Sequence, residues 1–200
     1  MITNWNEVTL QQYTQIYNII IDESLSEEEK LVCIVQELYT DIDIFNSKFG
    51  EVSDFFSSTA KLITSDIPSS IVQDTYTING TEYVLTKDIS NITTSQYMDY
   101  MHYMNGEVKN VNTYHDFLCI FLIPKDHKYN DGYNMAQVRK DILSMSITDI
   151  LGIADFFLVY YNKSLKVFQK YLVWEVLKAK GITIKEKMKM IKKIVGDYSH

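Results

Sequence analysis

Three neighbouring side chains have the types and spacing that chemistry requires. His115 and Cys119 would share one face of a helix and Asp116 is adjacent, so a metal site or a cysteine–histidine nucleophile is conceivable. Structural zinc takes four ligands and catalytic zinc takes three plus water, and no second cluster completes this set. Cys119 also lies in the apolar run Phe-Leu-Cys-Ile-Phe, where a thiol behaves as a small buried hydrophobe. We therefore expect neither a metal nor a cofactor, and no catalytic cysteine.

A second polar group follows Pro124 in a hydrophilic stretch and contains Asp126, His127 and Asp131. Exposed loops often carry catalytic side chains, but a polar stretch between apolar ones is more often a simple connection. The seven glycines form neither GxGxxG nor GxxxxGK[ST], which excludes nucleotide binding by those motifs. We expect a protein that is not an enzyme; the alternative would need an organised pocket near His127.

Helical patterns cover most of the 200 residues that must position these groups. Thr9 with Gln12 forms a capping-box pattern, and Ser26 precedes three glutamates that suit the positive end of a helix. Apolar spacing and helix-ending glycines or prolines then set the remaining boundaries. Further helices are predicted over residues 52–63, 93–104, 112–122, 135–143, 146–181 and from 183 onward.

One segment departs from the helical period, because Asn79-Gly80 stands between two runs that alternate polar and apolar residues. Asn-Gly suits both left-handed positions of a type I′ turn, which predicts a β-hairpin near residues 73–86. In that register Ile78 opposes Thr81 and the tyrosines at 76 and 83 face each other. The fold class predicted is mainly α with one β-hairpin, an α+β protein of about seven to eight helices.

The hairpin is also the first predicted interface. A two-stranded hairpin is marginal alone and its edges carry unpaired N–H and C=O groups, so it must pack on helices or pair with another chain. We predict a contact between subunits through strand pairing or through the face that carries the two tyrosines. The residues concerned are Tyr76, Ile78, Asn79, Gly80 and Tyr83.

The length fits one domain, with a subdivision considered at residues 1–68, 69–92 and 93–200. The N-terminus lacks the features of a signal peptide, and the apolar run at 150–161 contains Asp155 and falls short of the roughly 20 residues that span a membrane. Cys33 and Cys119 lie far apart in apolar surroundings, which suggests a reducing compartment. We expect an intracellular protein that does not contact membranes.

Charge is unevenly distributed along the chain. Residues 1–100 carry 4 lysines against 16 acidic residues, whereas residues 101–200 carry 15 basic residues against 10 acidic ones. Few aromatics and no arginine interleave with the last lysines, so specific nucleic-acid binding is not expected. A lysine run of this kind is most often a solvated helix face. The alternative is a contact with acidic surface on a neighbouring subunit, which is predicted to involve Lys185, Lys189 and Lys192.

Short motifs in the first two thirds of the chain resemble those of a known class of proteins. The motifs are Trp5-Asn-Glu-Val-Thr-Leu-Gln-Gln-Tyr13 before an acidic helix start, Tyr76-Thr-Ile-Asn-Gly-Thr-Glu-Tyr83, Gln96-Tyr-Met-Asp99 and Leu122-Ile-Pro124. Together they resemble small tail-module structural proteins of crAss-like phages and other phages of Bacteroides, above all the ring proteins of the tail. The motifs also resemble those of tail assembly chaperones.

The resemblance implies a virion protein of the tail, made in the cytoplasm of the host bacterium. A ring protein would form a homo-oligomer beneath the portal and contact neighbouring portal or tail proteins. The fifteen tyrosines agree with a protein that works through interfaces, because tyrosine offers a large contact area at low entropic cost. The basic C-terminal region lies outside the resemblance, so the choice between ring protein and assembly chaperone stays open.

Overall fold

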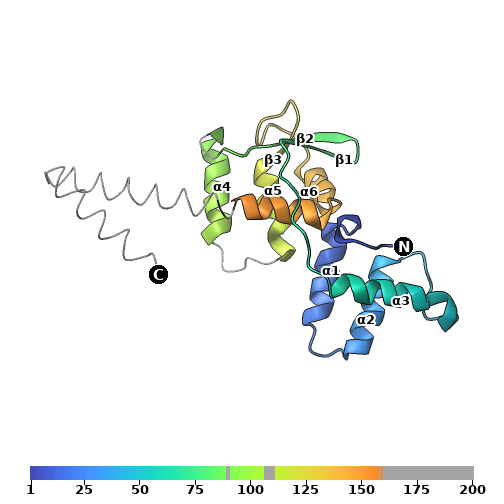
Figure 1. Ribbon diagram of the computed structural model, residues 1–200. Helices are drawn as coiled ribbons and strands as arrows, with labels where there is room; N and C mark the ends of the chain where they lie inside the picture. Colours follow the sequence, from blue (N-terminus) through green and yellow to red (C-terminus); the bar gives the residue numbers. More distant parts are fainter. Residues whose placement is uncertain (89–90, 106–110, 158, 160–200) are drawn as a thin grey trace, which may run out of the picture. The chain divides into compact units, whose positions relative to one another are not determined.

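A computed structural model describes residues 1–88, 91–105, 111–157 and 159. The chain divides into two compact units, Met1–Ala154 and Asp155–His200, and this boundary differs from the subdivision considered at residues 68 and 92. The first unit is mainly helical and contains a three-stranded antiparallel sheet (Figure 1), which confirms the predicted fold class. The predicted helix that begins at Thr183 lies outside the described residues.

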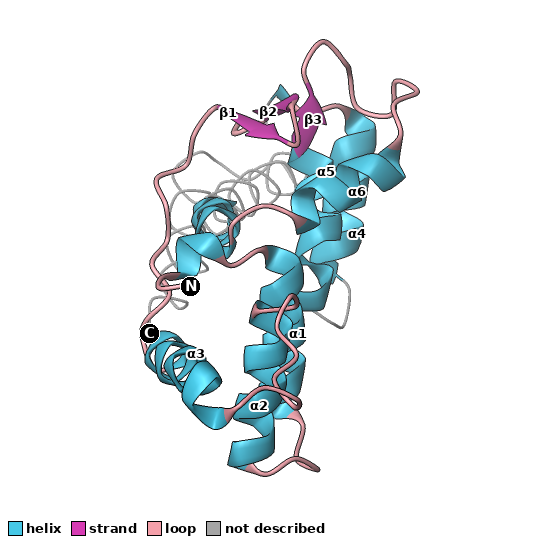
Figure 2. Cartoon of the chain, turned by 90° about the vertical axis from the view of Figure 1, so that its right-hand side faces the viewer, coloured by secondary structure: helices cyan, strands magenta, loops and turns pink. Residues whose placement is uncertain are grey.

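The N-terminal part consists of a short 3-10 helix, η1 (Trp5–Glu7), and three α-helices, α1 (Leu10–Ile21), α2 (Glu27–Leu38) and α3 (Phe49–Ile63). Both predicted N-caps are present, since Thr9 and Ser26 each accept a hydrogen bond from the backbone of the residue three positions on. Helix α3 begins earlier than predicted because Glu51 accepts from the backbone N–H of Lys48, which closes its first turn. Helix α2 contacts both α1 and α3 (Figure 2).

The predicted hairpin is confirmed, with β1 (Thr75–Ile78) and β2 (Thr81–Leu85) in the expected register. Asn79 and Gly80 have φ values of 50° and 81°, as a type I′ turn requires. A third strand, β3 (Leu122–Pro124), pairs with the other edge of β2 and was not predicted.

The last residue of a predicted helix therefore belongs to a strand. Helix α5 (Tyr114–Phe121) follows a short 3-10 helix, η3 (Val111–Thr113), and the chain passes from Phe121 directly into β3. The carbonyl of Phe121 accepts a hydrogen bond from the N–H of Thr86, just past β2. A pairing partner far away in the sequence thus replaces the next helical hydrogen bond, which local apolar spacing could not indicate.

Two further helices of the first unit are α4 (Thr94–Asn105) and α6 (Met135–Leu143), and both contact α5. Helix α6 has the boundaries that the sequence predicted. Aromatic rings fill the space between α4 and α5, with Tyr100 and Phe121 packed edge to face at a centroid distance of 5.6 Å. Gln96 is also buried, and its side-chain amide donates to the carbonyl of Ile120 over 2.9 Å.

A two-bond backbone bridge connects the start of the chain to the end of the first unit. The N–H of Leu10 donates to the carbonyl of Met145 over 2.8 Å, and the N–H of Ile147 donates to the carbonyl of Val8 over 2.9 Å. The residues paired by this bridge, Thr9 and Ser146, each immediately precede a helix, α1 in one case and helical residues 147–157 in the other. Two helix N-termini are therefore held side by side.

The extended segment after α3 crosses the helix at 147–157 in direct backbone contact. The N–H of Ser70 donates to the carbonyl of Thr148 over 3.0 Å. A Cβ atom placed on Gly152 would lie 2.3 Å from the carbonyl oxygen of Ser70, well inside van der Waals contact. Glycine is thus required at position 152 because the backbone of another segment occupies the space of a side chain.

We expect Gly152→Ala to lower the free energy of unfolding by about 1–3 kcal/mol, because the added methyl must displace backbone rather than a flexible side chain. Urea unfolding followed by circular dichroism would measure this loss. Gly50→Ala is the matched control, since Gly50 lies in α3 with open space around it and should leave stability unchanged or slightly raised. Equal stability of Gly152→Ala and wild type would contradict the close approach.

Candidate functional site

A buried carboxylate joins the hairpin to α6. Asp141 is 1% exposed, and its Oδ1 accepts from the side-chain amides of Asn79 over 3.0 Å and Gln137 over 2.8 Å. Its Oδ2 accepts from the hydroxyl of Tyr83 over 2.5 Å. The amide of Asn79 also donates to Oγ of Ser144 over 3.0 Å. We refer to these five residues as the Asp141 cluster.

The Asp141 cluster keeps its carboxylate ionised and its tyrosine protonated. Burial acts to raise the pKa of Asp141, but the hydrogen bonds from Asn79, Tyr83 and Gln137 outweigh it, and the pKa lies below its usual value. Burial and then the hydrogen bond to Asp141 raise the pKa of Tyr83 far above its usual value. Because the carboxylate is buried and already bonded to three donors, it holds the hairpin against α6 and is not available to a substrate.

The predicted interface residues of the hairpin are divided by the fold. Tyr76, Ile78 and Tyr83 are at most 7% exposed, since their side chains pack into the core of their own chain. The tyrosine face is therefore covered within its own chain, and its contact with a neighbouring subunit stays a prediction. Asn79 and Gly80 are exposed at the turn. Strand pairing by the hairpin stays a prediction, and the three lysines predicted to meet a neighbour, Lys185, Lys189 and Lys192, lie outside the described residues.

The two edges of the sheet differ in their protection. The strand order β1-β2-β3 makes β1 and β3 the edge strands. Strand β3 ends at Pro124, which lacks an N–H, and the next residue, Lys125, forms an ion pair with Glu82 of β2 at 2.9 Å. Proline and lysine are common means of preventing an edge strand from pairing with another chain. Strand β1 contains neither, and its four residues are Thr75, Tyr76, Thr77 and Ile78.

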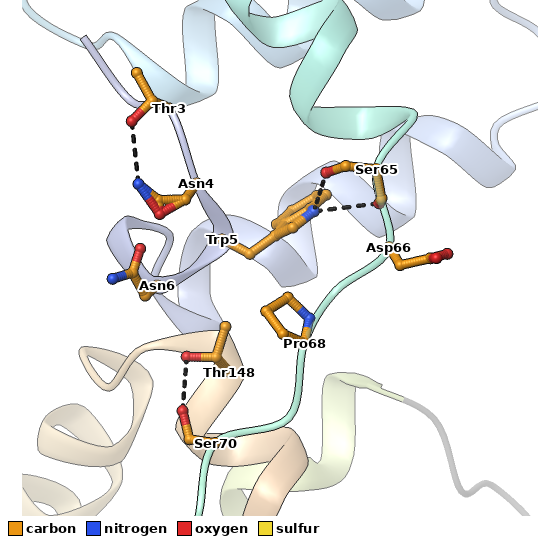
Figure 3. A pocket seen from close by; sticks show the side chains of 9 residues that line it. All are labelled: Thr3, Asn4, Trp5, Asn6, Ser65, Asp66, Pro68, Ser70 and Thr148. Carbon is orange, nitrogen blue, oxygen red and sulfur yellow. Dashed lines mark hydrogen bonds between the residues drawn. The ribbon is translucent and has the colours of Figure 1, made fainter.

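A polar hollow of about 400 Å³ lies where η1, the end of α3 and the start of the helix at 147–157 approach one another. Figure 3 shows the indole of Trp5 at its centre, with the indole N–H directed at Ser65 and the Asp66 side chain pointing away. The indole nitrogen donates to Oγ of Ser65 over 3.0 Å. Ser70 and Thr148 are hydrogen-bonded to each other on the opposite wall. Most of the hydroxyl and amide groups that line the hollow are hydrogen-bonded to one another. Such an arrangement is typical of a place where chain segments pack together.

A second hollow, of about 460 Å³, contains two of the three residues first considered for chemistry. Asp116 lines it and pairs with Nε of Arg139 at 3.0 Å, while His115 lies 3.6 Å from the other carboxylate oxygen of Asp116. Cys119 also lines it but is 2% exposed, and burial raises the pKa of its thiol to about 12. A thiol that remains protonated is neither a good nucleophile nor a good metal ligand.

The structure does not bring together the loop residues that were the other catalytic candidates. Asp126, His127 and Asp131 are all exposed and line neither hollow. The ring of His127 packs edge-on against Tyr133 with a centroid distance of 5.7 Å. Within the described residues, no group of three or more histidine, cysteine, aspartate or glutamate side chains is arranged to hold a metal ion.

Large apolar side chains on the surface are features that the sequence analysis missed. Phe45 and Phe49 are 70% and 76% exposed, and Ile71, four residues before β1, is 91% exposed. The spacing of these residues in the sequence does not indicate that they are exposed, because tertiary packing decides whether an apolar side chain is covered. None of the helices within the described part of the chain is long and apolar enough to cross a lipid bilayer.

Comparisons of the chain with protein-family models, with curated proteins and with solved structures find no match.

We expect Tyr83→Phe to lower the free energy of unfolding by about 1.5–3 kcal/mol, since it removes a hydrogen bond to a buried charge. The control Tyr129→Phe removes a hydrogen bond to the exposed Asp99 and should cost below about 1 kcal/mol. Urea unfolding at neutral pH measures both; equal losses would contradict the central role of Asp141.

The pH dependence of the same variant provides a second readout. Because the pKa of Asp141 is lower in the folded than in the unfolded protein, its stabilisation is complete above about pH 4 and is lost as the pH falls through the folded pKa. Removing the Tyr83 hydroxyl brings the folded pKa closer to the unfolded value. Tyr83→Phe should therefore lose less stability on acidification than the wild type, as measured by urea unfolding between pH 6 and pH 3.

Proposed function

We propose that this protein is a structural component of a bacteriophage virion, a tail ring protein whose copies assemble into a multi-subunit ring beneath the portal. The resemblance of its sequence motifs to tail ring proteins suggests the setting. The observation that carries the proposal is the unprotected edge of β1. In a ring, each copy presents one surface to a different surface of the next copy, so one free edge per subunit suffices.

Hairpin geometry identifies the groups that this edge offers. In a two-residue hairpin the pair next to the turn, Ile78 and Thr81, is hydrogen-bonded, and the pairs alternate along the strands. Tyr76 is therefore bonded to Tyr83, while Thr75 and Thr77 direct their N–H and C=O groups away from β2. Among the described residues, no hydrogen bond to these outward groups is present. An extended segment from a neighbouring copy can bind here by strand addition.

Side chains beside the edge favour the same use. Thr75 and Thr77 are exposed and uncharged, so they present no repulsion to an added strand. Ile71 lies on the same chain segment just before β1, and its side chain would be covered by a segment that continues past Thr75. Burial of an isoleucine that is 91% exposed contributes roughly 1.5–3 kcal/mol to such a contact.

Thr77→Pro is expected to abolish oligomers of the full-length protein, because it removes an outward N–H but none of the hydrogen bonds between β1 and β2. Mass photometry of the purified protein measures the oligomers, and circular dichroism verifies that the monomer stays folded. Thr77→Val keeps the N–H and serves as the control, which should assemble like the wild type. A folded Thr77→Pro protein that assembles normally would rule out strand addition at β1.

The location in the virion is tested separately by quantitative mass spectrometry of purified particles. A ring protein should be present in a fixed copy number well above one, whichever contact holds the ring together. A tail assembly chaperone, the alternative suggested by the same motifs, would bind a long tail component during assembly and be absent from finished particles. Absence would therefore overturn the ring proposal and favour the chaperone.

A further inference from the structure

We propose that Asn79-Gly80 is a site of spontaneous deamidation, that the Asp141 cluster controls its rate, and that conversion of Asn79 releases the hairpin from α6 irreversibly. The inference rests on the contacts of one side chain at the turn and does not depend on the function proposed above.

The chemistry needs only the chain and water. The backbone nitrogen of Gly80 attacks Cγ of Asn79, the bond from Cγ to Nδ2 breaks, and ammonia leaves with the proton of the Gly80 nitrogen. Water then opens the resulting succinimide ring at either carbonyl and yields aspartate or isoaspartate, with no change in oxidation state. Glycine as the following residue favours ring closure because it has no side chain to obstruct the attack and tolerates many backbone conformations.

The folded structure exposes this turn to water but restrains its reactive group. Asn79 is exposed and has a φ of 50°, while Gly80 has a φ of 81°. Both protons of the Asn79 amide are engaged, one by Oδ1 of Asp141 and the other by Oγ of Ser144, each at 3.0 Å. The amide is therefore held against α6, and ring closure requires that both hydrogen bonds break first.

The product cannot return to the same position. A carboxylate at residue 79 has no proton to donate to Asp141 or Ser144, and it would lie about 3 Å from a carboxylate that is 1% exposed. Two like charges so close in a poorly solvated site repel strongly. Isoaspartate would also lengthen the backbone by one atom within a two-residue turn that tolerates no insertion. Deamidation of Asn79 thus occurs only in molecules whose hairpin has opened, and it prevents the hairpin from packing against α6 again.

The rate is measured by peptide mapping with mass spectrometry during incubation at mildly alkaline pH. Asn105-Gly106, the other Asn-Gly pair of the chain, provides an internal reference for each sample. In each sample, the rate of deamidation at Asn79 is divided by the rate at Asn105. We expect this ratio to be several-fold lower in the folded protein than in urea. Ser144→Ala should increase the rate in the folded protein several-fold, because it removes one of the two restraints.

The matched control is Ser24→Ala, which removes an exposed serine that bonds to Asp22 and is not in contact with the cluster. It should leave the rate at Asn79 unchanged. Equal rates at Asn79 in the folded wild type, in Ser144→Ala and in urea would overturn control by the cluster. Absence of conversion even in urea would overturn the modification site itself.

The release of the hairpin is tested by Asn79→Asp, which creates the aspartate product directly. Asn79→Gly is its control, because glycine suits the turn and removes the amide without adding charge. We expect Asn79→Asp to melt at a lower temperature than Asn79→Gly at neutral pH, with the difference disappearing below about pH 4 as carboxylates are protonated. An Asn79→Asp protein that melts like the wild type would overturn the release.

Discussion

A carboxylate removed from water needs hydrogen-bond donors, and the structure of the first unit depends on how Asp141 obtains them. An unpaired buried charge is so unfavourable that the surrounding chain must supply every donor itself. Here the donors come from the turn, from β2 and from α6, at Asn79, Tyr83 and Gln137. They meet only when the hairpin has the correct register and α6 is in place. The cluster thus couples the register of the hairpin to the packing of the sheet against α6.

Backbone hydrogen bonds between distant segments complete the unit. The bridge at Thr9 and Ser146 joins the first residues to the start of the helix at 147–157, and the segment through Ser70 crosses that helix against Gly152. These contacts leave the helix N-termini capped and their surroundings apolar, since Val8, Leu10 and Ile147 are fully buried. The polar hollow beside Trp5 is a consequence of the same junction, where hydroxyls and amides satisfy one another.

Among the described residues, two groups that could react, the Cys119 thiol and the Asp141 carboxylate, are buried in the structure. The thiol of Cys119 is buried and protonated, and the carboxylate of Asp141 is surrounded by donors. Tyrosine abundance, which suggested interfaces, is partly explained by the core, because Tyr76, Tyr83 and Tyr100 are buried. In the described part of the chain, features open to a partner include backbone groups along β1 and a few exposed apolar side chains. They fit a protein whose role is assembly, as proposed.

The sequence by itself determined the features that depend on neighbouring residues. The cap at Thr9, the limits of α6 and the register set by Asn79-Gly80 were all predictable, because each depends on hydrogen bonds within a few residues. The tertiary structure alone decided the third strand, the required glycine at 152, the burial of the tyrosine face and the Asp141 cluster. Each of these depends on a partner 20 or more residues away, and the spacing of residues along a chain does not encode which distant segment will approach.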